Sequence, residues 1–94
     1  RNQILYIESH GRHSNIHTTS DSYEITESLL SLEKRFPDYF LRCHQSFLVN
    51  MDHVRQIGKE FLLSNGETIP IRQRGVKPVR QAYMAYAAAL SAAY

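Results

Sequence analysis

The 94-residue chain has one cysteine, no tryptophan, four glycines and three prolines. The lone thiol, Cys43, excludes an internal disulfide and a multi-cysteine zinc site, and it fits a reducing cytoplasm. No apolar run approaches the roughly 20 residues that a membrane helix needs, and no signal-peptide pattern opens the chain. We therefore expect a cytoplasmic segment without membrane contact. Residues 1–94, 43% of them hydrophobic, suit one compact domain, which we expect to be part of a longer protein.

Acidic residues are absent from three segments, although the formal net charge is only +2. Segment 9–20 carries Arg12 and three histidines, segment 39–51 carries Arg42 and His44, and the chain from residue 68 onward carries four cations. Five of the nine acids fall between the first two segments. Three acid-free basic segments in one small domain favour a polyanionic partner, and ordinary surface charge is the alternative explanation.

Strand-forming runs dominate the hydrophobic pattern. We expect strands at 4–7, 13–19, 23–26, 47–49, 54–57, 61–64 and 67–71, with a helical turn at 51–53. The last strand is expected to continue through 72–74 and to end at Gly75. The Asn65-Gly66 pair predicts a two-residue type I′ hairpin, which requires a positive φ at both positions.

Two helices complete the expected fold. Four apolar residues at i, i+4, i+7 and i+11 predict a short amphipathic helix: Ile25, Leu29, Leu32 and Phe36. Thr26 is its expected N-cap, and Pro37 stops it. Pro78 suits the first position of a final helix, whose apolar stripe is Val79, Tyr83, Tyr86 and Leu90. The predicted class is mostly β with short helices, and because no two helices are joined by a tight turn, a helix-turn-helix is excluded.

The segment Phe40-Leu41-Arg42-Cys43-His44-Gln45-Ser46-Phe47-Leu48-Val49-Asn50 is the most informative. Its polar centre between two phenylalanines is unlike plain core. In a continuous strand Arg42, His44 and Ser46 would share one side. Arginine binds guanine or phosphate, glutamine pairs with adenine, and serine or histidine donates to phosphate. The alternative is that His44 and Ser46 bond nearby backbone to fix a loop.

The chain resembles the LytTR family of DNA-binding domains. Segments 4–9, 11–12, 16–18, 29–32, 40–50 and 66–74 match its order and spacing, and Phe-x-Arg-x-His-x-Ser-Phe-x-Val-Asn is the most specific part. The resemblance implies an elongated, multi-sheet β fold that places loop side chains into successive major grooves of double-stranded DNA. It also implies the output domain of a bacterial two-component response regulator that acts at promoter direct repeats. An upstream receiver or sensor domain is implied too, and a dimer on DNA is left open. The family usually has another strand upstream of the segment 4–7, and we expect that strand to be truncated here.

The resemblance implies three contact segments, which coincide with the acid-free segments. The loop after the first strand would contribute His13 and Ser14, with Arg12 beside them. The central motif would contribute His44 and Gln45, with Arg42 nearby. The last segment would contribute Arg74 to base reading, and Arg72 and Lys77 to phosphates. Family members commonly carry arginine or asparagine where this chain has Gln45, so a different base preference is implied.

Other readings are weaker. His10, His13 and His17 suggest a metal site, but the segment 9–20 that holds them has no carboxylate or cysteine and scattered histidines on a polar strand are usually solvated, so we expect no metal and no cofactor. Cys43 beside His44 resembles a nucleophile with its base, but neighbouring strand residues face opposite ways, so we expect no enzyme. RNA binding needs exposed aromatic rings, whereas Tyr6, Tyr23, Phe40 and Phe47 sit in apolar contexts. A protein-interaction module also stays open.

Overall fold

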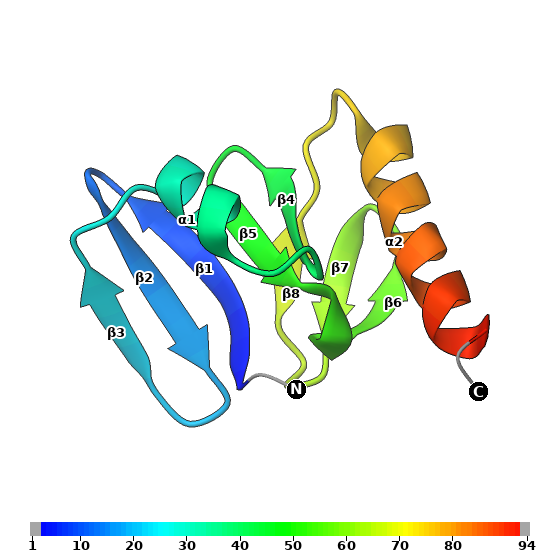
Figure 1. The fold of residues 1–94 in the computed structure, drawn as a ribbon, viewed down its shortest axis with the longest axis horizontal. Helices are drawn as coiled ribbons and strands as arrows, with labels where there is room; N and C mark the ends of the chain where they lie inside the picture. The colour runs from blue at the N-terminus through cyan, green and yellow to red at the C-terminus, as the bar shows by residue number, and fades with distance from the viewer. Residues whose placement is uncertain (1–2, 93–94) are drawn as a thin grey trace.

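The computed structural model describes residues 3–92 as a mostly β fold with two helices (Figure 1). The elements are β1 (Ile4–His10), β2 (His13–Thr18), β3 (Ser22–Ile25), α1 (Leu29–Arg35), β4 (Phe40–His44), β5 (Phe47–Asn50), a 3-10 turn (Met51–His53), β6 (Val54–Ile57), β7 (Glu60–Leu63), β8 (Thr68–Pro70) and α2 (Val76–Ala92). The predicted fold class is confirmed. Neither described helix is long and apolar enough to cross a membrane.

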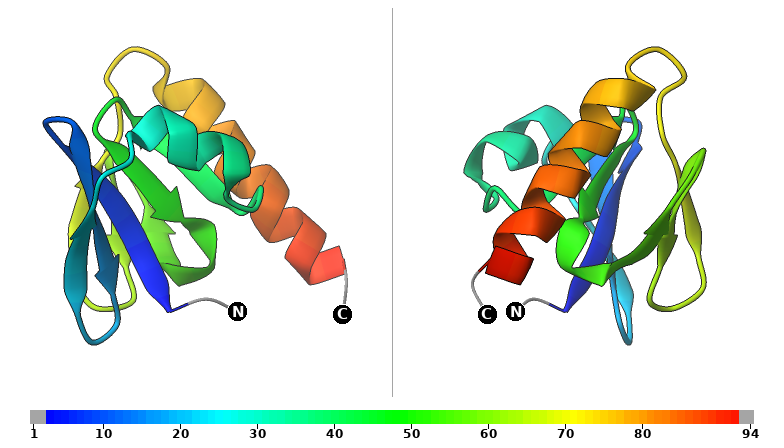
Figure 2. Two further views of the ribbon diagram at one scale, coloured as in Figure 1. Left: turned by 60° about the vertical axis from the view of Figure 1, so that its left-hand side comes forward. Right: turned by 90° about the vertical axis from the view of Figure 1, so that its right-hand side faces the viewer.

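The strands form two antiparallel sheets. The larger has the order β3-β2-β1-β5-β4 and the smaller the order β6-β7-β8. α1 covers one face of the larger sheet, and α2 runs beside the smaller one (Figures 1 and 2). The molecule measures 37 × 30 × 26 Å along its principal axes.

β1 is buried on both faces because α1 packs on one face of the larger sheet and the smaller sheet and α2 pack on the other. Ile7 joins a cluster beneath α1 that contains Leu29 and Leu32. Leu5 and Tyr6 join the other cluster, which the two sheets and α2 enclose. A register irregularity between Ile4 and Tyr6 in the β1–β2 pairing accompanies this departure from alternation. Two apolar clusters therefore hold the larger sheet between α1 and the rest of the molecule.

The expected start of the first helix is wrong by two residues. Ser28, not Thr26, is the N-cap, and its hydroxyl oxygen accepts from the Ser31 N–H at 3.2 Å. Both residue types can cap, so the sequence alone does not choose between them. Of the expected apolar face, Leu29 and Leu32 are buried on α1, whereas Ile25 lies in β3 and Phe36 is the C-cap.

The hairpin at Asn65-Gly66 differs from the expected type I′ turn. Gly66 has a φ of +91°, but Asn65 does not have a positive φ. The N–H of Gly66 donates to the carbonyl of Leu63 at 3.0 Å, and the Leu63 N–H donates to Glu67 at 2.9 Å. The loop thus has three residues, with a left-handed glycine at its end.

The chain leaves the smaller sheet earlier than expected. β8 ends at Pro70, so residues 72–74 form a loop and not a strand. α2 then begins at Val76, which puts Pro78 inside the first turn instead of at its start. Along the predicted stripe Val79 is buried, whereas Leu90 is 40% exposed near the free end of the helix.

Candidate functional site

Three loops lie at one edge of the molecule. They are the β1–β2 turn, the β4–β5 turn and the loop 71–75, seen along the top in Figures 1 and 2. The topology explains this, because β5 pairs antiparallel with both β1 and β4, so the end of β1 and the start of β5 share an edge. The three acid-free segments of the sequence therefore meet in space.

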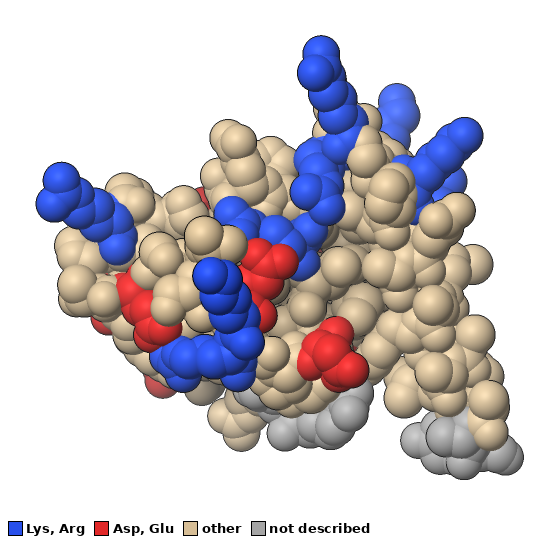
Figure 3. Space-filling model, turned by 45° about the horizontal axis from the view of Figure 1, so that its top comes forward, with Lys and Arg blue, Asp and Glu red and all other residues tan. Residues whose placement is uncertain are grey.

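Backbone hydrogen bonds tie these loops together. The Ser9 N–H donates to the Ser46 carbonyl at 2.8 Å and links β1 to the β4–β5 turn. The Arg72 N–H donates to the Cys43 carbonyl at 2.9 Å and links the loop 71–75 to β4. Figure 3 turns this edge forward and shows Lys and Arg side chains projecting from it, with a few carboxylates among them. The edge is a preformed and largely basic surface.

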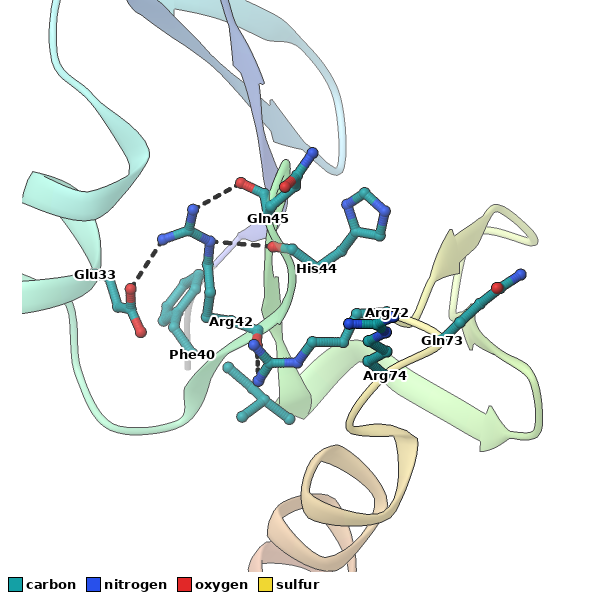
Figure 4. A pocket seen from close by; sticks show the side chains of 9 residues that line it. Glu33, Phe40, Arg42, His44, Gln45, Arg72, Gln73 and Arg74 are labelled. Carbon is teal, nitrogen blue, oxygen red and sulfur yellow. Dashed lines mark hydrogen bonds and ion pairs between the residues drawn. The ribbon is translucent and has the colours of Figure 1, made fainter.

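A groove of about 750 Å³ opens between the β4–β5 turn and the loop 71–75 (Figure 4). Its lining consists of Glu33, Phe40, Leu41, Arg42, His44, Gln45, Arg72, Gln73 and Arg74. Five expected site residues are thus brought together: Arg42, His44, Gln45, Arg72 and Arg74. The other four, Arg12, His13, Ser14 and Lys77, lie outside this groove.

Arg42 supports the β4–β5 turn from within. Its Nε donates to the His44 carbonyl at 3.1 Å and its Nη2 to the Gln45 carbonyl at 2.6 Å. Its Nη1 contacts Oε1 of Glu33 at 2.9 Å. The Arg42 side chain is only 22% exposed. Three donors of the guanidinium are therefore engaged within the described part of the chain.

His44 combines the two roles that the sequence left open, a hydrogen bond that fixes its own loop and a donor that a partner can reach. Its Nδ1 accepts from the Ser46 N–H at 3.1 Å, which fixes the turn. In the neutral ring Nε2 therefore carries the hydrogen and presents one outward donor. The ring packs edge-on against Phe47 with centroids 5.6 Å apart. One nitrogen serves the loop and the other is free to act as a donor.

Gln45 combines a fixed backbone with a free side chain. Its carbonyl is held by Arg42, while the residue itself is exposed. No hydrogen bond of its side-chain amide is recorded within residues 3–92. Such a group can pair with an external donor and acceptor without a cost for breaking internal bonds.

The loop 71–75 presents cations from a fixed base. Ile71 is buried, and Gly75 has a φ of +96°, which favours glycine at this position. Arg72 Nη2 lies 3.4 Å from the Arg42 carbonyl. Arg74 and Lys77 are exposed, and their side chains have no partner within the described part of the chain.

The β1–β2 turn contributes one exposed cation, Arg12. His13 is half-buried, with its Nδ1 3.8 Å from Oε1 of Glu24. Ser14 is a correction to the expected contact set: it is fully buried, and its hydroxyl donates to the Glu27 carbonyl at 2.7 Å. The strand period turns this side chain inward, so it is unavailable to a partner at the surface.

The rival sites lack the required geometry. Within residues 3–92 no group of three or more histidine, cysteine or acidic side chains is arranged to hold a metal ion. His17 stacks on Tyr6 with centroids 4.3 Å apart, and its Nε2 lies 3.5 Å from Glu8. Burial raises the pKa of Cys43 to about 12, so its thiol stays protonated. The thiol packs as a small apolar group.

Three of the four aromatic residues that we expected in apolar surroundings are buried or half-buried, and one is not. Tyr6 and Phe40 are buried, and Phe47 is half-buried. Tyr23 is 51% exposed on β3, the outer strand of the larger sheet, so its expected apolar context is wrong. A residue on an edge strand has a neighbouring strand on one side only, so it is more exposed than the sequence pattern suggests.

Sequence reasoning missed two groove residues, Gln73 and Glu33. Gln73 is exposed between two arginines, so the acid-free segment could have indicated it. Glu33 meets Arg42 only because α1 packs on the larger sheet, and no sequence signal reports that contact. A second, smaller groove of about 430 Å³ beside α2 includes Lys59 and Arg80 in its lining.

Comparisons with known proteins agree with this architecture. Residues 1–84 match the model of the LytTr DNA-binding domain family. Transcriptional regulatory protein LytR of Staphylococcus aureus is 35% identical over 79% of this chain and 33% of its own length. Transcriptional regulatory protein BtsR of Salmonella typhi is 39% identical over 84% of this chain and 35% of its own. The chain thus spans about a third of these relatives. A solved LytTr DNA-binding domain from Bacillus cereus has a TM-score of 0.79 at 26% identity, covering 85% of this chain and 80% of that one.

Proposed function

The chain belongs to the LytTr DNA-binding domain family, and we propose that it binds duplex DNA sequence-specifically to regulate transcription. The observation that carries the proposal is the convergence of three acid-free segments on one edge, around the groove that holds His44, Gln45 and Arg74. Regulators need such a surface because cations on phosphates supply affinity, while a few side chains at base edges supply specificity.

We propose that loop side chains enter two neighbouring major grooves on one side of the duplex. The three loops follow one another along part of the longest axis, and α2 extends beyond the loop 71–75 (Figure 1). One turn of B-DNA rises about 34–36 Å, so the long side chains of Arg12 and Arg74 on the two outer loops would reach outwards towards the two grooves. The β4–β5 turn would lie between them.

Each loop has a proposed task. Arg12, Arg72 and Lys77 would contact phosphates, because they are exposed cations at the edge or beside it. Arg74 would read guanine, and Gln45 would read adenine through its donor and acceptor pair. His44 would donate through Nε2, and His13 would approach the groove beside Arg12. Arg42 would act chiefly by supporting the turn, and Ser14 has no contact role in this proposal.

We also propose that the domain is the output half of a cytoplasmic response regulator. The relatives are named as regulatory proteins, and one from Bacillus subtilis, 29% identical, is named sensory transduction protein LytT. Since the chain spans about a third of their length, an upstream receiver or sensor domain would supply the signal. Binding as a dimer at direct repeats would follow if two domains occupy one promoter.

Selection of duplexes from a random pool tests the proposal. The expected result is a motif with two short blocks about one helical turn apart, and tighter binding of that duplex than of either separated strand. Equal binding of the single strands would favour an RNA-type or single-strand module, with Tyr23 as its exposed ring. Failure to bind any nucleic acid would favour a protein-interaction module. Either result would overturn the proposal.

A further inference from the structure

Glu33 is the one acidic side chain among the described residues that line the groove (Figure 4). A carboxylate at a surface that receives phosphates weakens binding through repulsion. Its presence in an otherwise basic groove therefore calls for a compensating role. Its partner is Arg42, whose Nη1 donates to Glu33 Oε1 at 2.9 Å.

Arg42 links Glu33 to the backbone of the β4–β5 turn. The same guanidinium donates to the carbonyls of His44 and Gln45, at 3.1 and 2.6 Å. A planar guanidinium with three engaged donors has little rotational freedom. The carboxylate of α1 thus fixes the arginine, and the arginine fixes the two carbonyls next to the side chains proposed to read bases.

The turn needs such support because of its conformation. Only Gln45 and Ser46 separate the paired residues His44 and Phe47, and neither has a positive φ. Two-residue hairpins favour turns with positive φ, whose twist matches the strands. The pairing is also irregular between Arg42 and His44. The turn is therefore not strongly preferred by its own residues, and side-chain hydrogen bonds hold it.

We infer that Glu33 is a positioning residue that keeps Arg42 in the turn and away from DNA phosphates, so that Gln45 and His44 meet base edges in a fixed register. The inference rests on the proposed function. Without Glu33 the guanidinium is free to reach a phosphate, which adds a contact common to every sequence. Loss of the carboxylate then strengthens binding to random DNA and weakens preference for the selected site.

The test compares Glu33→Gln with Glu60→Gln. Glu60 is exposed on β7 outside the groove, and no ion pair of its side chain is recorded among the described residues. Both variants remove one negative charge, so they share the general gain in DNA affinity. The dissociation constants are measured on the selected duplex and on a random duplex across a salt series, and a thermal melt verifies folding of each variant.

We expect Glu33→Gln to lower the ratio of selected to random affinity by about tenfold, the size of one lost base contact. Its salt slope on random DNA should steepen by about one, for one added phosphate contact. Exchange of the Ser46 amide hydrogen, which bonds to His44 Nδ1, should accelerate in the free protein. Glu60→Gln should change both affinities by one common factor and leave the Ser46 exchange rate as it is.

An unchanged affinity ratio and an unchanged Ser46 exchange rate in folded Glu33→Gln would overturn the inference. The proposed function fails separately, if the wild-type domain does not prefer the selected duplex. Amide exchange is measured without DNA, so the support that Glu33 gives to the turn is tested even if the wild-type domain does not prefer the selected duplex. Arg42→Lys keeps the charge but loses the fork, and it should reproduce the loss of preference.

Discussion

The backbone N–H of Ser9 donates to the carbonyl oxygen of Ser46 over 2.8 Å, and this bond joins the ends of two proposed contact loops. Together with the bond from Arg72 to Cys43, it makes the edge a single unit before any partner arrives. A preformed surface loses little conformational entropy on binding, so the specificity should reside in the exposed side chains themselves.

Arg74→Ala should cost about 1–3 kcal/mol at the selected site and relax the choice at one base pair, because Arg74 is exposed and has no partner in the described chain. Arg55→Ala, an exposed arginine on β6 outside the groove, is the matched control. Titrations on selected and random duplexes measure both variants. An equal loss on the two duplexes would make Arg74 a phosphate contact.

Salt should weaken binding in proportion to the phosphates contacted. Arg12, Arg72 and Lys77 are the exposed cations proposed to contact phosphates. Release of roughly three counterions gives a log–log slope of about −3. The slope comes from affinities measured at several salt concentrations. A slope near zero would remove the electrostatic part of the mechanism.

Ser14→Ala should lower the free energy of unfolding by about 1–2 kcal/mol and leave the selected DNA motif intact. The reason is that the buried hydroxyl donates to the Glu27 carbonyl at 2.7 Å, and the variant strands that acceptor. Denaturant unfolding and DNA selection measure the two effects. Weaker DNA binding at unchanged stability would return Ser14 to the contact set.

Acid should remove a contribution that Glu27 makes to stability. Hydrogen bonds from Arg35 and Ser31 lower the pKa of Glu27 to about 2. Because the folded pKa of Glu27 lies below its unfolded value of about 4.5, the ionised carboxylate stabilises the fold above that value, and the contribution is lost as the pH falls through about 2. Glu27→Gln should therefore be less stable than the wild type at pH 7 and equal to it near pH 2. A difference that persists unchanged at pH 2 contradicts this account.

The sequence predicts the elements better than the contacts between them. Periodicity located most of the strands and part of the face of α1, because burial imposes periods of two and 3.6 on apolar residues. It did not separate β4 from β5, because the polar residues of the segment 40–46 interrupt the apolar pattern. It misplaced the cap at Thr26 because Ser28 caps equally well. It assigned Asn65-Gly66 a type I′ turn because the pair permits that turn, while the register of β7 and β8 uses a three-residue loop. The partnership of Glu33 with Arg42 depends on how α1 docks, and local patterns carry no record of it.

We expect Gln45 to read a base from a turn whose backbone is already fixed. A Gln amide donates to N7 and accepts from the amino group of adenine, whereas arginine presents only donors and suits guanine. DNA selected by Gln45→Arg is therefore the most direct measurement. We expect preference at one position to move from adenine towards guanine by about 1–2 kcal/mol. A selected motif that matches the wild type at every position, with at most a uniform gain in affinity from the added charge, would contradict the claim.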